Sequence, residues 1–351
     1  MIERLRQEIA AAGGWISFGR YMEMALQAYY GRDDRQFGAA GDFVTAPELG
    51  RLFGRTLARQ LRELEGPILE LGAGTGALAE TLLAEEPFEY FILETSAALR
   101  ARQAARLGAG VMFLERLPQK FRGVVLANEV VDALPVERFR IGRSRCEALG
   151  VIATSAGFSF EPRAAGAALS RAVGALQAKL PSPMPPGFVS ELRLGQGDWI
   201  AAAVRSMTRG AMLVVDYGLP RSQYYHPSRD GGTLCAFRRH RRVEDVLAHP
   251  GLQDLTAWVD FSALAESAAA CGLEVGGFAT QAHFLVSTGI ERELARLAEA
   301  AGERERLALR QSAATLLLPG EMGERFKAMA LARGIRGPFD GFGFRDLSAS
   351  L

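Results

Sequence analysis

Three glycines that follow an acid form the stretch of this sequence best suited to binding a cofactor. The apolar run 68–71, which contains Glu70, leads into Gly72, Gly74 and Gly76, and helix-forming residues come next. This order predicts a strand, a tight turn and a helix. Glycine permits the backbone angles of such a turn and lets a ligand lie against the main chain. The helix start adds free N–H groups and the positive end of a dipole.

Two classes of cofactor bind a turn of this kind. Gly72, Gly74 and Ala77 also match the G-x-G-x-x-G/A pattern of dinucleotide-binding proteins. A dinucleotide places its pyrophosphate on the helix N–H groups, where the acid at Glu70 is unfavourable. S-adenosylmethionine (SAM) has no phosphate but carries an ammonium and a sulfonium, which an acid attracts. Glu70 and the third glycine, Gly76, therefore favour SAM, and a turn without any ligand remains the structural alternative.

A second acid follows the next predicted strand. The apolar run 90–93 ends at Glu94, about 20 residues after the glycines. In this class of fold an acid at that distance accepts hydrogen bonds from both ribose hydroxyls of a nucleoside ligand. A third predicted strand, 111–114, ends where an adenine would lie. The cofactor contacts that we predict at these two strand ends are Glu94, Thr95, Glu115, Arg116 and Leu117.

Polar side chains also follow the fourth predicted strand, 123–127. Ligands of open α/β sheets bind at the carboxyl ends of the strands. Asn128 and Glu129 are therefore expected to face the same cleft. Asp132 lies three residues after Glu129 and shares its face if this segment is helical. We predict Asn128 as a cofactor contact, and Glu129 and Asp132 as acids beside the reacting group.

The alternation of strands and helices over 67–128 predicts a parallel sheet of the α/β class. The runs 273–278 and 283–287 pair naturally as a C-terminal antiparallel hairpin, which is the usual end of a class I SAM-dependent methyltransferase sheet of the Rossmann-like type. Further short antiparallel strands are expected at 136–141 and 147–152. The predicted organisation is a helical N-terminal segment 1–66, a first core half 67–135, an inserted substrate-side segment 136–188, a second core half 189–290 with an inserted loop 219–260, and a C-terminal helical segment 291–351.

A helix start is predicted before the glycine turn. Thr45 fits an N-cap, Pro47 fits the first turn and Glu48 completes a capping box, which predicts a helix over 47–64. The glycine-containing segment 41–43 is expected to form a turn before this helix.

Composition excludes several classes of protein. The chain has 351 residues, and its 41 basic and 40 acidic side chains give a net charge of +1, so nothing global indicates a nucleic-acid partner. The three cysteines are widely separated and the four histidines show no ligand spacing, so no metal site is expected. No apolar run reaches membrane-spanning length. Glu3 and Glu8 among the first arginines disfavour a transit peptide, and we expect a cytoplasmic protein.

The densest basic run is 238–242. It is either a solvated or phosphate-binding loop or a docking site for an acceptor protein. Binding of nucleic acid is disfavoured because only Phe237 accompanies the run as a stacking residue.

Several segments of the chain resemble the MidA-like family of SAM-dependent methyltransferases. The resemblance covers roughly residues 14–332, and its blocks are 42–48, 70–76, 128–135, 215–218, 254–261 and 322–327. The mitochondrial members of this family are complex I assembly factors that methylate an arginine of the quinone-site subunit. The resemblance therefore implies SAM as cofactor and a protein acceptor that carries the target arginine, with a complex I subunit or a similar protein as that acceptor. The oligomeric state is left open.

The resemblance also adds residues to the predicted site. It moves 41–43 from a simple turn into the site, and the implied acceptor contacts are Gly41, Phe43, Thr45 and Tyr217. The docking alternative for the basic run adds Arg238 and Arg239 as predicted acceptor contacts. For catalysis, Glu129 together with Asp132 or Asp42 would hold the guanidinium in bidentate fashion and stabilise charge that develops on the attacking nitrogen. Two alternatives stay open: a SAM enzyme for a small molecule, and a noncatalytic assembly factor that keeps the fold. The long insertions favour a large acceptor.

Overall fold

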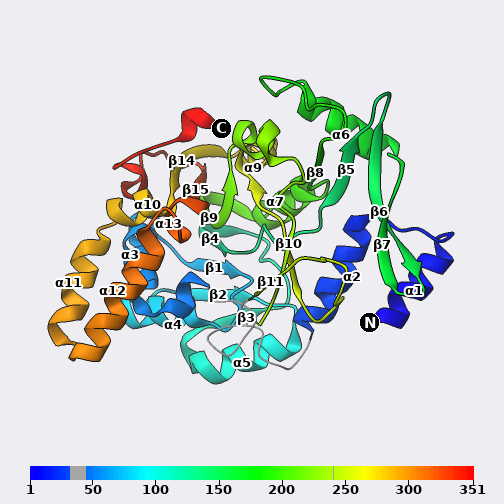
Figure 1. Cartoon of the computed structure of the whole chain (residues 1–351). Coiled ribbons are helices and arrows are strands. Elements are labelled where there is room, and N and C mark those ends of the chain that lie inside the picture. The colour runs from blue at the N-terminus through cyan, green and yellow to red at the C-terminus, as the bar shows by residue number, and fades with distance from the viewer. Residues whose placement is uncertain (32–44, 240) are drawn as a thin grey trace.

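The computed structural model describes residues 1–31, 45–239 and 241–351, so the predicted site residues Gly41, Asp42 and Phe43 lie outside the described residues. Its centre is an eight-stranded sheet (Figure 1). Along this sheet the strands follow the order β14, β15, β9, β4, β1, β2 and β3, and the short β13 pairs with β9. The strands are β1 (Ile68–Leu71), β2 (Tyr90–Leu93), β3 (Met112–Leu114), β4 (Phe121–Asn128), β9 (Met207–Leu219), β13 (Val259–Asp260), β14 (Glu274–Thr280) and β15 (Phe326–Arg333).

The strand directions confirm the predicted α/β class. β3, β2, β1, β4 and β9 are successive parallel neighbours, whereas β15 is antiparallel to both β9 and β14. All four residues of β1 are buried, as expected for a strand at the centre of a sheet that is covered on both faces. The result is a Rossmann-like sheet whose parallel strands end on one common edge.

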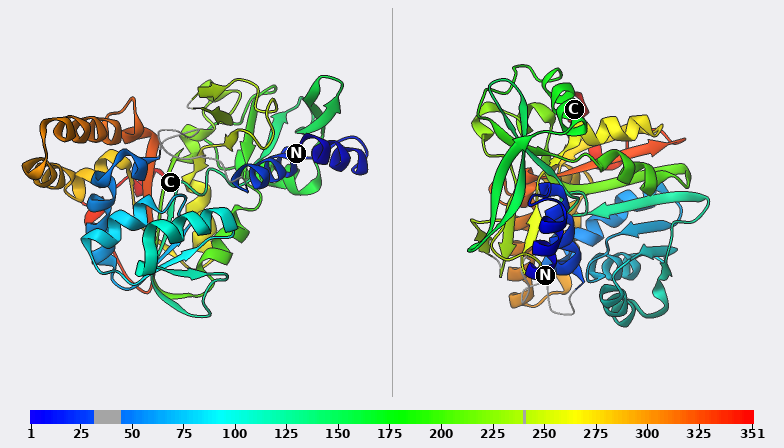
Figure 2. Two further views of the ribbon diagram at one scale, coloured as in Figure 1. Left: turned by 90° about the horizontal axis from the view of Figure 1, so that it is seen from below. Right: turned by 90° about the vertical axis from the view of Figure 1, so that its right-hand side faces the viewer.

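Helices cover both faces of the sheet (Figures 1 and 2). One face packs against Leu57, Leu78 and Leu316, and the other packs against Ile200 and Leu264. The helices around the sheet are α3 (Arg51–Leu64), α4 (Ala77–Glu85), α5 (Ala97–Leu107), α7 (Gln196–Val204), α9 (Phe261–Ala270), α10 (Gln281–Ser287), α11 (Ile290–Ala300), α12 (Glu303–Leu317) and α13 (Met322–Arg325). Shorter helices are η1 (Ala46–Leu49), η2 (Gly108–Gly110), α8 (Arg221–Tyr224), η3 (Pro227–Arg229), η4 (Asp340–Phe342) and η5 (Ser348–Ser350).

A second sheet forms an arm beside the core, and we call it the arm sheet. It is antiparallel, with the order β7, β6, β5, β8, and it contains the two strands predicted in the insertion. Its elements are β5 (Glu137–Ile141), β6 (Cys146–Thr154), β7 (Gly157–Ala164), β8 (Val189–Leu192) and the helix α6 (Ala167–Gln177). The N-terminal helices α1 (Ile2–Ala11) and α2 (Phe18–Tyr30) lie beside this arm (Figure 1). The ring of Phe18 contacts that of Phe160, and the ring of Tyr21 contacts that of Phe158.

A third, small sheet occupies the inserted loop 219–260. It has the order β11, β10, β12 and consists of β10 (Cys235–Arg238), β11 (Arg241–Val243) and β12 (Asp254–Thr256). We call it the flap sheet. It lies between α2 and the carboxyl ends of the central strands, and Figure 1 shows it in front of them.

The predicted C-terminal hairpin is wrong in its second strand. β14 does pair antiparallel with a neighbour, but that neighbour is β15, and 281–287 is the helix α10. Thr280 ends β14 and caps α10, since its side chain accepts a hydrogen bond from the His283 N–H at 3.2 Å. Short apolar runs do not distinguish a strand from a helix by periodicity alone. The segment 291–351 is likewise not only helical, because it supplies β15.

The helix predicted over 47–64 is interrupted at Gly50. The segment begins as the 3₁₀ helix η1, Gly50 follows with φ of 123°, and α3 starts only at Arg51. The Thr45 side chain caps nothing, and the Glu48 carboxylate accepts a hydrogen bond from the Thr75 hydroxyl instead of closing a capping box. A tertiary partner has therefore replaced the local capping pattern.

The described residues hold no helix that is both long and apolar enough to cross a bilayer. Within the same ranges, no group of three or more His, Cys, Asp or Glu side chains is arranged to hold a metal ion.

Candidate active site

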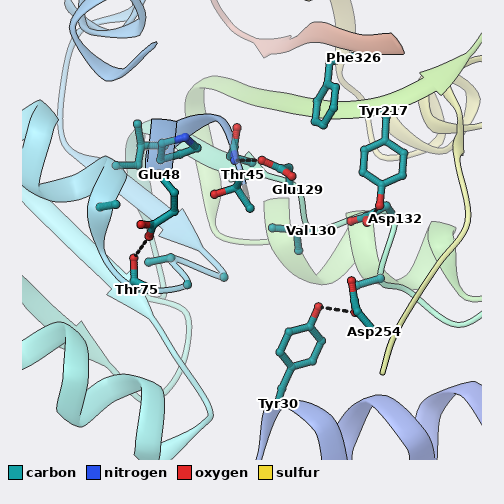
Figure 3. Close-up of a pocket in the computed structure, with 18 of the residues that line it drawn as sticks. Tyr30, Thr45, Glu48, Thr75, Glu129, Val130, Asp132, Tyr217, Asp254 and Phe326 are labelled. Carbon is teal, nitrogen blue, oxygen red and sulfur yellow. Dashed lines mark hydrogen bonds between the residues drawn. The ribbon is translucent and has the colours of Figure 1, made fainter. Parts of the chain in front are cut away.

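A cavity of about 600 Å³ lies at the carboxyl ends of β1, β2, β4 and β9. The glycine turn, the residues after β2 and β4, the flap sheet and α13 all contribute to its wall. Figure 3 shows Glu129 and Val130 between Thr75 of the glycine turn and Asp254 of the flap sheet. The parallel strands place these segments together because their carboxyl ends meet at one edge of the sheet. Of the predicted site residues, Thr45, Tyr217 and the strand-end acids Glu70, Glu94, Glu129 and Asp132 are part of the cavity wall.

The glycine turn has the backbone that its sequence requires. Gly72, Gly74 and Gly76 adopt φ angles of 64°, 53° and 81°, which side chains other than glycine rarely accept. Gly72 and Gly74 line the cavity. Gly76 instead begins α4, and a Cβ there would lie 3.1 Å from Leu107 Cδ1. Two of the three predicted glycines therefore face the ligand space, and the third allows α4 and α5 to approach each other.

Glu70 lies inside the cavity wall at the end of β1. Its carboxylate is buried and accepts a hydrogen bond of 2.9 Å from the Tyr90 hydroxyl. Burial raises the pKa of Glu70 to about 7, although the Tyr90 bond acts in the opposite direction. A cation bound beside this carboxyl group would stabilise the ionised form. The position and the charge of Glu70 therefore suit the ammonium of SAM.

Glu94 is held at the end of β2 by two donors. Its carboxylate accepts hydrogen bonds from the Ser96 N–H at 2.8 Å and from Gln103 Nε2 at 3.1 Å. Gln103 Nε2 also donates to the Gly74 carbonyl at 2.9 Å, so one side chain connects the predicted ribose acceptor to the glycine turn. Glu94 and Thr95 line the cavity.

The residues predicted as cofactor contacts after β3 do not line this cavity. Glu115, Arg116 and Leu117 are absent from the wall of this cavity as far as the structure describes it. The Glu115 side chain is 85 % exposed and lies 3.8 Å from Arg100 Nη1. The adenine contact proposed for this segment therefore stays a prediction.

Replacing Glu94 by alanine is expected to weaken SAM binding by about 1–3 kcal/mol, since the ribose hydroxyls would lose a charged acceptor. Titration calorimetry on the purified variant measures this loss. Asp346→Ala is the matched control, because Asp346 also accepts from the backbone N–H two residues on, that of Ser348 at 2.9 Å, but lies outside the cavity wall. Unchanged SAM affinity in a folded Glu94→Ala protein would refute the ribose assignment.

Two acids after β4 form the other half of the site. Glu129 has a φ of 54°, and its carboxylate accepts hydrogen bonds from the Ala46 N–H at 3.3 Å and from Asn128 Nδ2 at 3.2 Å. Removal from water, followed by the nearby Asp132 charge, raises the pKa of Glu129 to about 8. Figure 3 shows Glu129 next to Thr45, on the side of the cavity closed by η1. Asn128 Oδ1 is buried and has no hydrogen-bond partner among the described residues.

Asp132 lies deeper, beside Tyr217. The Tyr217 hydroxyl donates to Asp132 Oδ2, whereas Asp132 Oδ1 is buried and lacks a hydrogen-bond partner within the described ranges. Asp216 holds the segment that follows β4 in place, because its Oδ2 accepts hydrogen bonds from the N–H groups of Val131 at 2.9 Å and Asp132 at 3.2 Å. Burial raises the pKa of both Asp132 and Asp216. The segment after β4 is a turn and not a helix, yet it still brings Glu129 and Asp132 into one cavity.

Several residues of the cavity wall were missed by sequence reasoning. Tyr30 donates to Asp254 at 3.1 Å, and the Phe326 ring meets the Tyr217 ring edge-on with centroids 5.1 Å apart (Figure 3). Trp258 also lines the cavity. Asp254, Trp258 and Phe326 belong to segments noted for the family resemblance, which was the one available signal. Tyr30 carried none, because only the fold brings α2 to this edge.

The arginines of the basic run in the flap sheet are not part of the cavity wall as the structure describes it. Phe237 lines the cavity, but Arg238 and Arg239 do not. Arg238 pairs with Arg241 across the β10–β11 ladder. The acceptor contacts predicted for Arg238 and Arg239 would therefore be made with a part of the acceptor that lies outside this cavity.

The strand order, the glycine turn after β1 and the acid after β2 define a class I SAM-dependent methyltransferase. A family model for S-adenosyl-L-methionine-dependent methyltransferases matches residues 52–279. The chain belongs to this family, and SAM is its cofactor. The hydrogen-bond acceptors of the cavity fit that cofactor: Glu70 suits a cation, Glu94 suits ribose hydroxyls, and Asn128 Oδ1 is an acceptor without a partner among the described residues.

Comparisons with individual proteins agree with this assignment. A Burkholderia thailandensis protein whose crystal structure contains S-adenosyl-homocysteine is 37% identical, with a TM-score of 0.91 over 100% of this chain and 96% of that chain. The Drosophila melanogaster protein named protein arginine methyltransferase NDUFAF7 homolog, mitochondrial, is 28% identical over 95% of this chain and 85% of its own length. The Homo sapiens protein arginine methyltransferase NDUFAF7 is 27% identical over 94% and 83%.

Proposed function

We propose that this methyltransferase modifies an arginine side chain of a protein. The observation that carries the proposal is the unpartnered Asp132 Oδ1, a buried acceptor atom in the same cavity as Glu129. A guanidinium offers several N–H donors in a fixed plane and pairs with carboxylates in bidentate fashion. The names of the fly and human relatives support the same acceptor class.

The charge of the cavity also favours a cationic acceptor. Within the described part of the chain, its wall carries seven carboxyl groups but one positively charged side chain, that of Arg325. The acids are Glu48, Glu70, Glu94, Glu129, Asp132, Asp254 and Glu321. A wall with this excess of acids attracts a positively charged side chain and disfavours an acidic one.

The residues of the chain can then be given roles. SAM, when bound, supplies an electrophilic methyl group. Glu129 and Asp132 hold the guanidinium plane, which leaves mainly positioning for the protein to perform. Their charge stabilises the positive charge that grows on the attacking nitrogen. Glu129, whose pKa is about 8, is suited to receive the proton that this nitrogen loses once it is methylated. Asp42, by resemblance, is the alternative second acid.

The proposal extends to the identity of the acceptor and to the location of the protein. The resemblance to the MidA-like family supports a subunit of respiratory complex I or a similar protein as the acceptor. Arg238 and Arg239 would bind acidic residues that flank the target arginine. For the location, the cytoplasm stays a prediction, and the fly and human relatives are named mitochondrial.

The proposal is tested with methyl-labelled SAM and a lysate from cells that lack this protein. The purified enzyme is expected to transfer label to acid-precipitable protein, and hydrolysis of that protein should release labelled methylarginine. Label that appears only in soluble metabolites would identify a small-molecule methyltransferase. No label from an enzyme that binds SAM by calorimetry would identify a noncatalytic assembly factor. A Glu129→Gln protein in the same lysate controls for background labelling.

A further inference from the structure

Arg193, the residue that follows β8 of the arm sheet, reaches into the wall of the active site. Its Nη1 donates to the Trp258 carbonyl at 2.6 Å, and its Nη2 donates to the Asp132 carbonyl at 2.9 Å and to the Ala257 carbonyl. One side chain therefore binds three carbonyl oxygens from two separate loops. Both loops contribute to the cavity, one through Asp132 and the other through Trp258.

A second set of hydrogen bonds runs from β8 to the loop that contains Trp258. Glu191 Oε1 accepts hydrogen bonds of 2.7 Å from both the N–H and the hydroxyl of Thr233. The Thr233 hydroxyl oxygen in turn accepts from the Trp258 N–H at 2.9 Å. The arm sheet thus holds Trp258 at its N–H through Thr233 and at its carbonyl through Arg193. The two cavity loops are also bonded to each other, since the Ala257 N–H donates to the Asp132 carbonyl at 3.2 Å.

The guanidinium is chemically suited to this position. Its planar fork of donors can serve three carbonyls at once, whereas a lysine ammonium is a compact charge without that fixed geometry. The same side chain brings a positive charge near Asp132, which lowers the pKa of that carboxyl group against the larger effect of burial. Arg193 therefore acts on Asp132 both through backbone position and through charge.

We propose that Arg193 is a positioning residue for the methyl-transfer reaction, which fixes the Asp132 and Trp258 loops to the arm sheet and so sets the shape of the acceptor half of the cavity. Asp132 touches the acceptor in this scheme, so the proposal rests on the proposed function. Arg193 itself contacts neither substrate. The arm sheet is then a part of the active site's support, and not a separate appendage of the fold.

The chain offers a matched control in Arg333. Its Nη1 donates to the carbonyls of Val204 at 3.2 Å and Met207 at 2.6 Å, and its Nη2 donates to that of Cys271. Arg333 therefore also binds three carbonyls from separate segments, but none of these residues lines the cavity. Replacing either arginine removes hydrogen bonds to three carbonyl groups. Only Arg193 makes these bonds to loops that line the cavity.

The experiment compares Arg193→Met and Arg193→Lys with Arg333→Met and Arg333→Lys. Hydrogen–deuterium exchange of the unliganded proteins is measured first. Both Arg193 variants are expected to show faster exchange of amides in 131–134 and 255–258, because the fork that joins these loops is lost. Neither Arg333 variant should change exchange in these segments, even though its melting temperature falls.

Steady-state rates against pH give the second measurement. Arg193→Met is expected to lower kcat by about a hundredfold, the cost of a small misplacement of catalytic groups. The acidic limb of the profile, which the neighbouring acids Glu129 and Asp132 set together, should move to higher pH, because Asp132 loses a nearby positive charge. Arg193→Lys keeps the charge, so it should lower kcat while leaving the limb in place. The other titratable groups that face Asp132 are Glu129, Asp216, Tyr217, Tyr30 and Cys235, and none of them is changed.

Each outcome decides one question. If the Arg193 variants keep wild-type exchange in 131–134 and 255–258, the positioning role is wrong, whatever the acceptor is. If exchange rises but kcat and the pH limb match those of the Arg333 variants, Arg193 is only structural. If wild-type enzyme labels no protein, the proposed function fails separately, and the exchange data still test whether Arg193 holds the loops.

Discussion

Glu129→Gln is expected to lower the rate of methyl transfer by about 10²–10³-fold while SAM affinity stays near that of the wild type. Loss of one preorganised group that stabilises developing charge typically costs about 2.7–4 kcal/mol. Glutamine keeps the size of the side chain and removes its charge. Glu129 follows β4 and accepts a hydrogen bond from the Ala46 N–H, whereas Glu94, the proposed ribose acceptor, follows β2. Single-turnover rates and calorimetry on one preparation measure both quantities.

The pH dependence gives a second test of Glu129. Its pKa is raised to about 8, so the ionised form is a minority below this value. If the carboxylate is the active form, kcat/KM of the wild type rises with pH and levels off above about 8. This limb should vanish in Glu129→Gln. A flat profile in the wild type would argue against an ionised Glu129 in the reaction.

The thermal stability of Glu129→Gln distinguishes a catalytic role of Glu129 from a structural one. A carboxyl group whose pKa is raised in the folded state stabilises the fold most at low pH, and this contribution is lost as pH rises through about 8. At pH 9 the wild type carries a desolvated charge that glutamine lacks. The variant should therefore melt at the same or a higher temperature there. A lower melting temperature together with a proportional loss of rate would indicate a structural role for Glu129.

Glu137→Gln is the control for replacing a partly buried acid. Glu137 accepts from the Ser17 hydroxyl at 2.7 Å and from the Gly19 N–H at 3.4 Å, and removal from water raises its pKa as well. Like Glu129 it has one side-chain donor and one backbone donor, but it belongs to the arm sheet and does not line the cavity. Its amide variant should change stability and leave the rate of transfer close to that of the wild type.

The central part of the fold was predictable because its signals are local. The run 68–71 is buried at every position, and the three glycines after it need positive φ angles, so the strand and the turn could both be inferred. Tyr90–Leu93 forms a strand with the predicted bounds for the same reason. Once these strands are parallel, the geometry of the sheet brings Glu94 and Glu129 into one cavity.

The remaining parts depend on contacts that the sequence does not display. β15 lies more than forty residues after its partner β14, and the runs 281–287 and 326–333 are both short and apolar. Their roles could not be distinguished by periodicity. Tyr30 reaches Asp254 across more than two hundred residues, which only the packing of α2 beside the flap sheet achieves. Glu48 bonds Thr75 for the same kind of reason, so the local capping pattern was misleading.

Gly74→Val is expected to abolish SAM binding in titration calorimetry. Gly74 lines the cavity with a φ of 53°, where a β-branched side chain is strained and would extend from the turn that holds the cofactor. The strain also lowers the free energy of unfolding by roughly 1–3 kcal/mol, and the melting temperature falls with it. The loss of binding must therefore be separated from the loss of stability.

Gly108→Val provides that separation. Gly108 has a φ of 57°, nearly that of Gly74, and a Cβ added there meets no atom within 4 Å, so this variant bears the backbone strain without entering the cavity. A ligand that binds only the folded state raises the melting temperature, and the stabilisation grows with the logarithm of the ratio of ligand concentration to Kd. SAM should therefore raise the melting temperature of the wild type and of Gly108→Val, but not that of Gly74→Val. Equal shifts in both variants would show that the glycine turn is not the cofactor site, because strain alone would then explain what Gly74→Val loses.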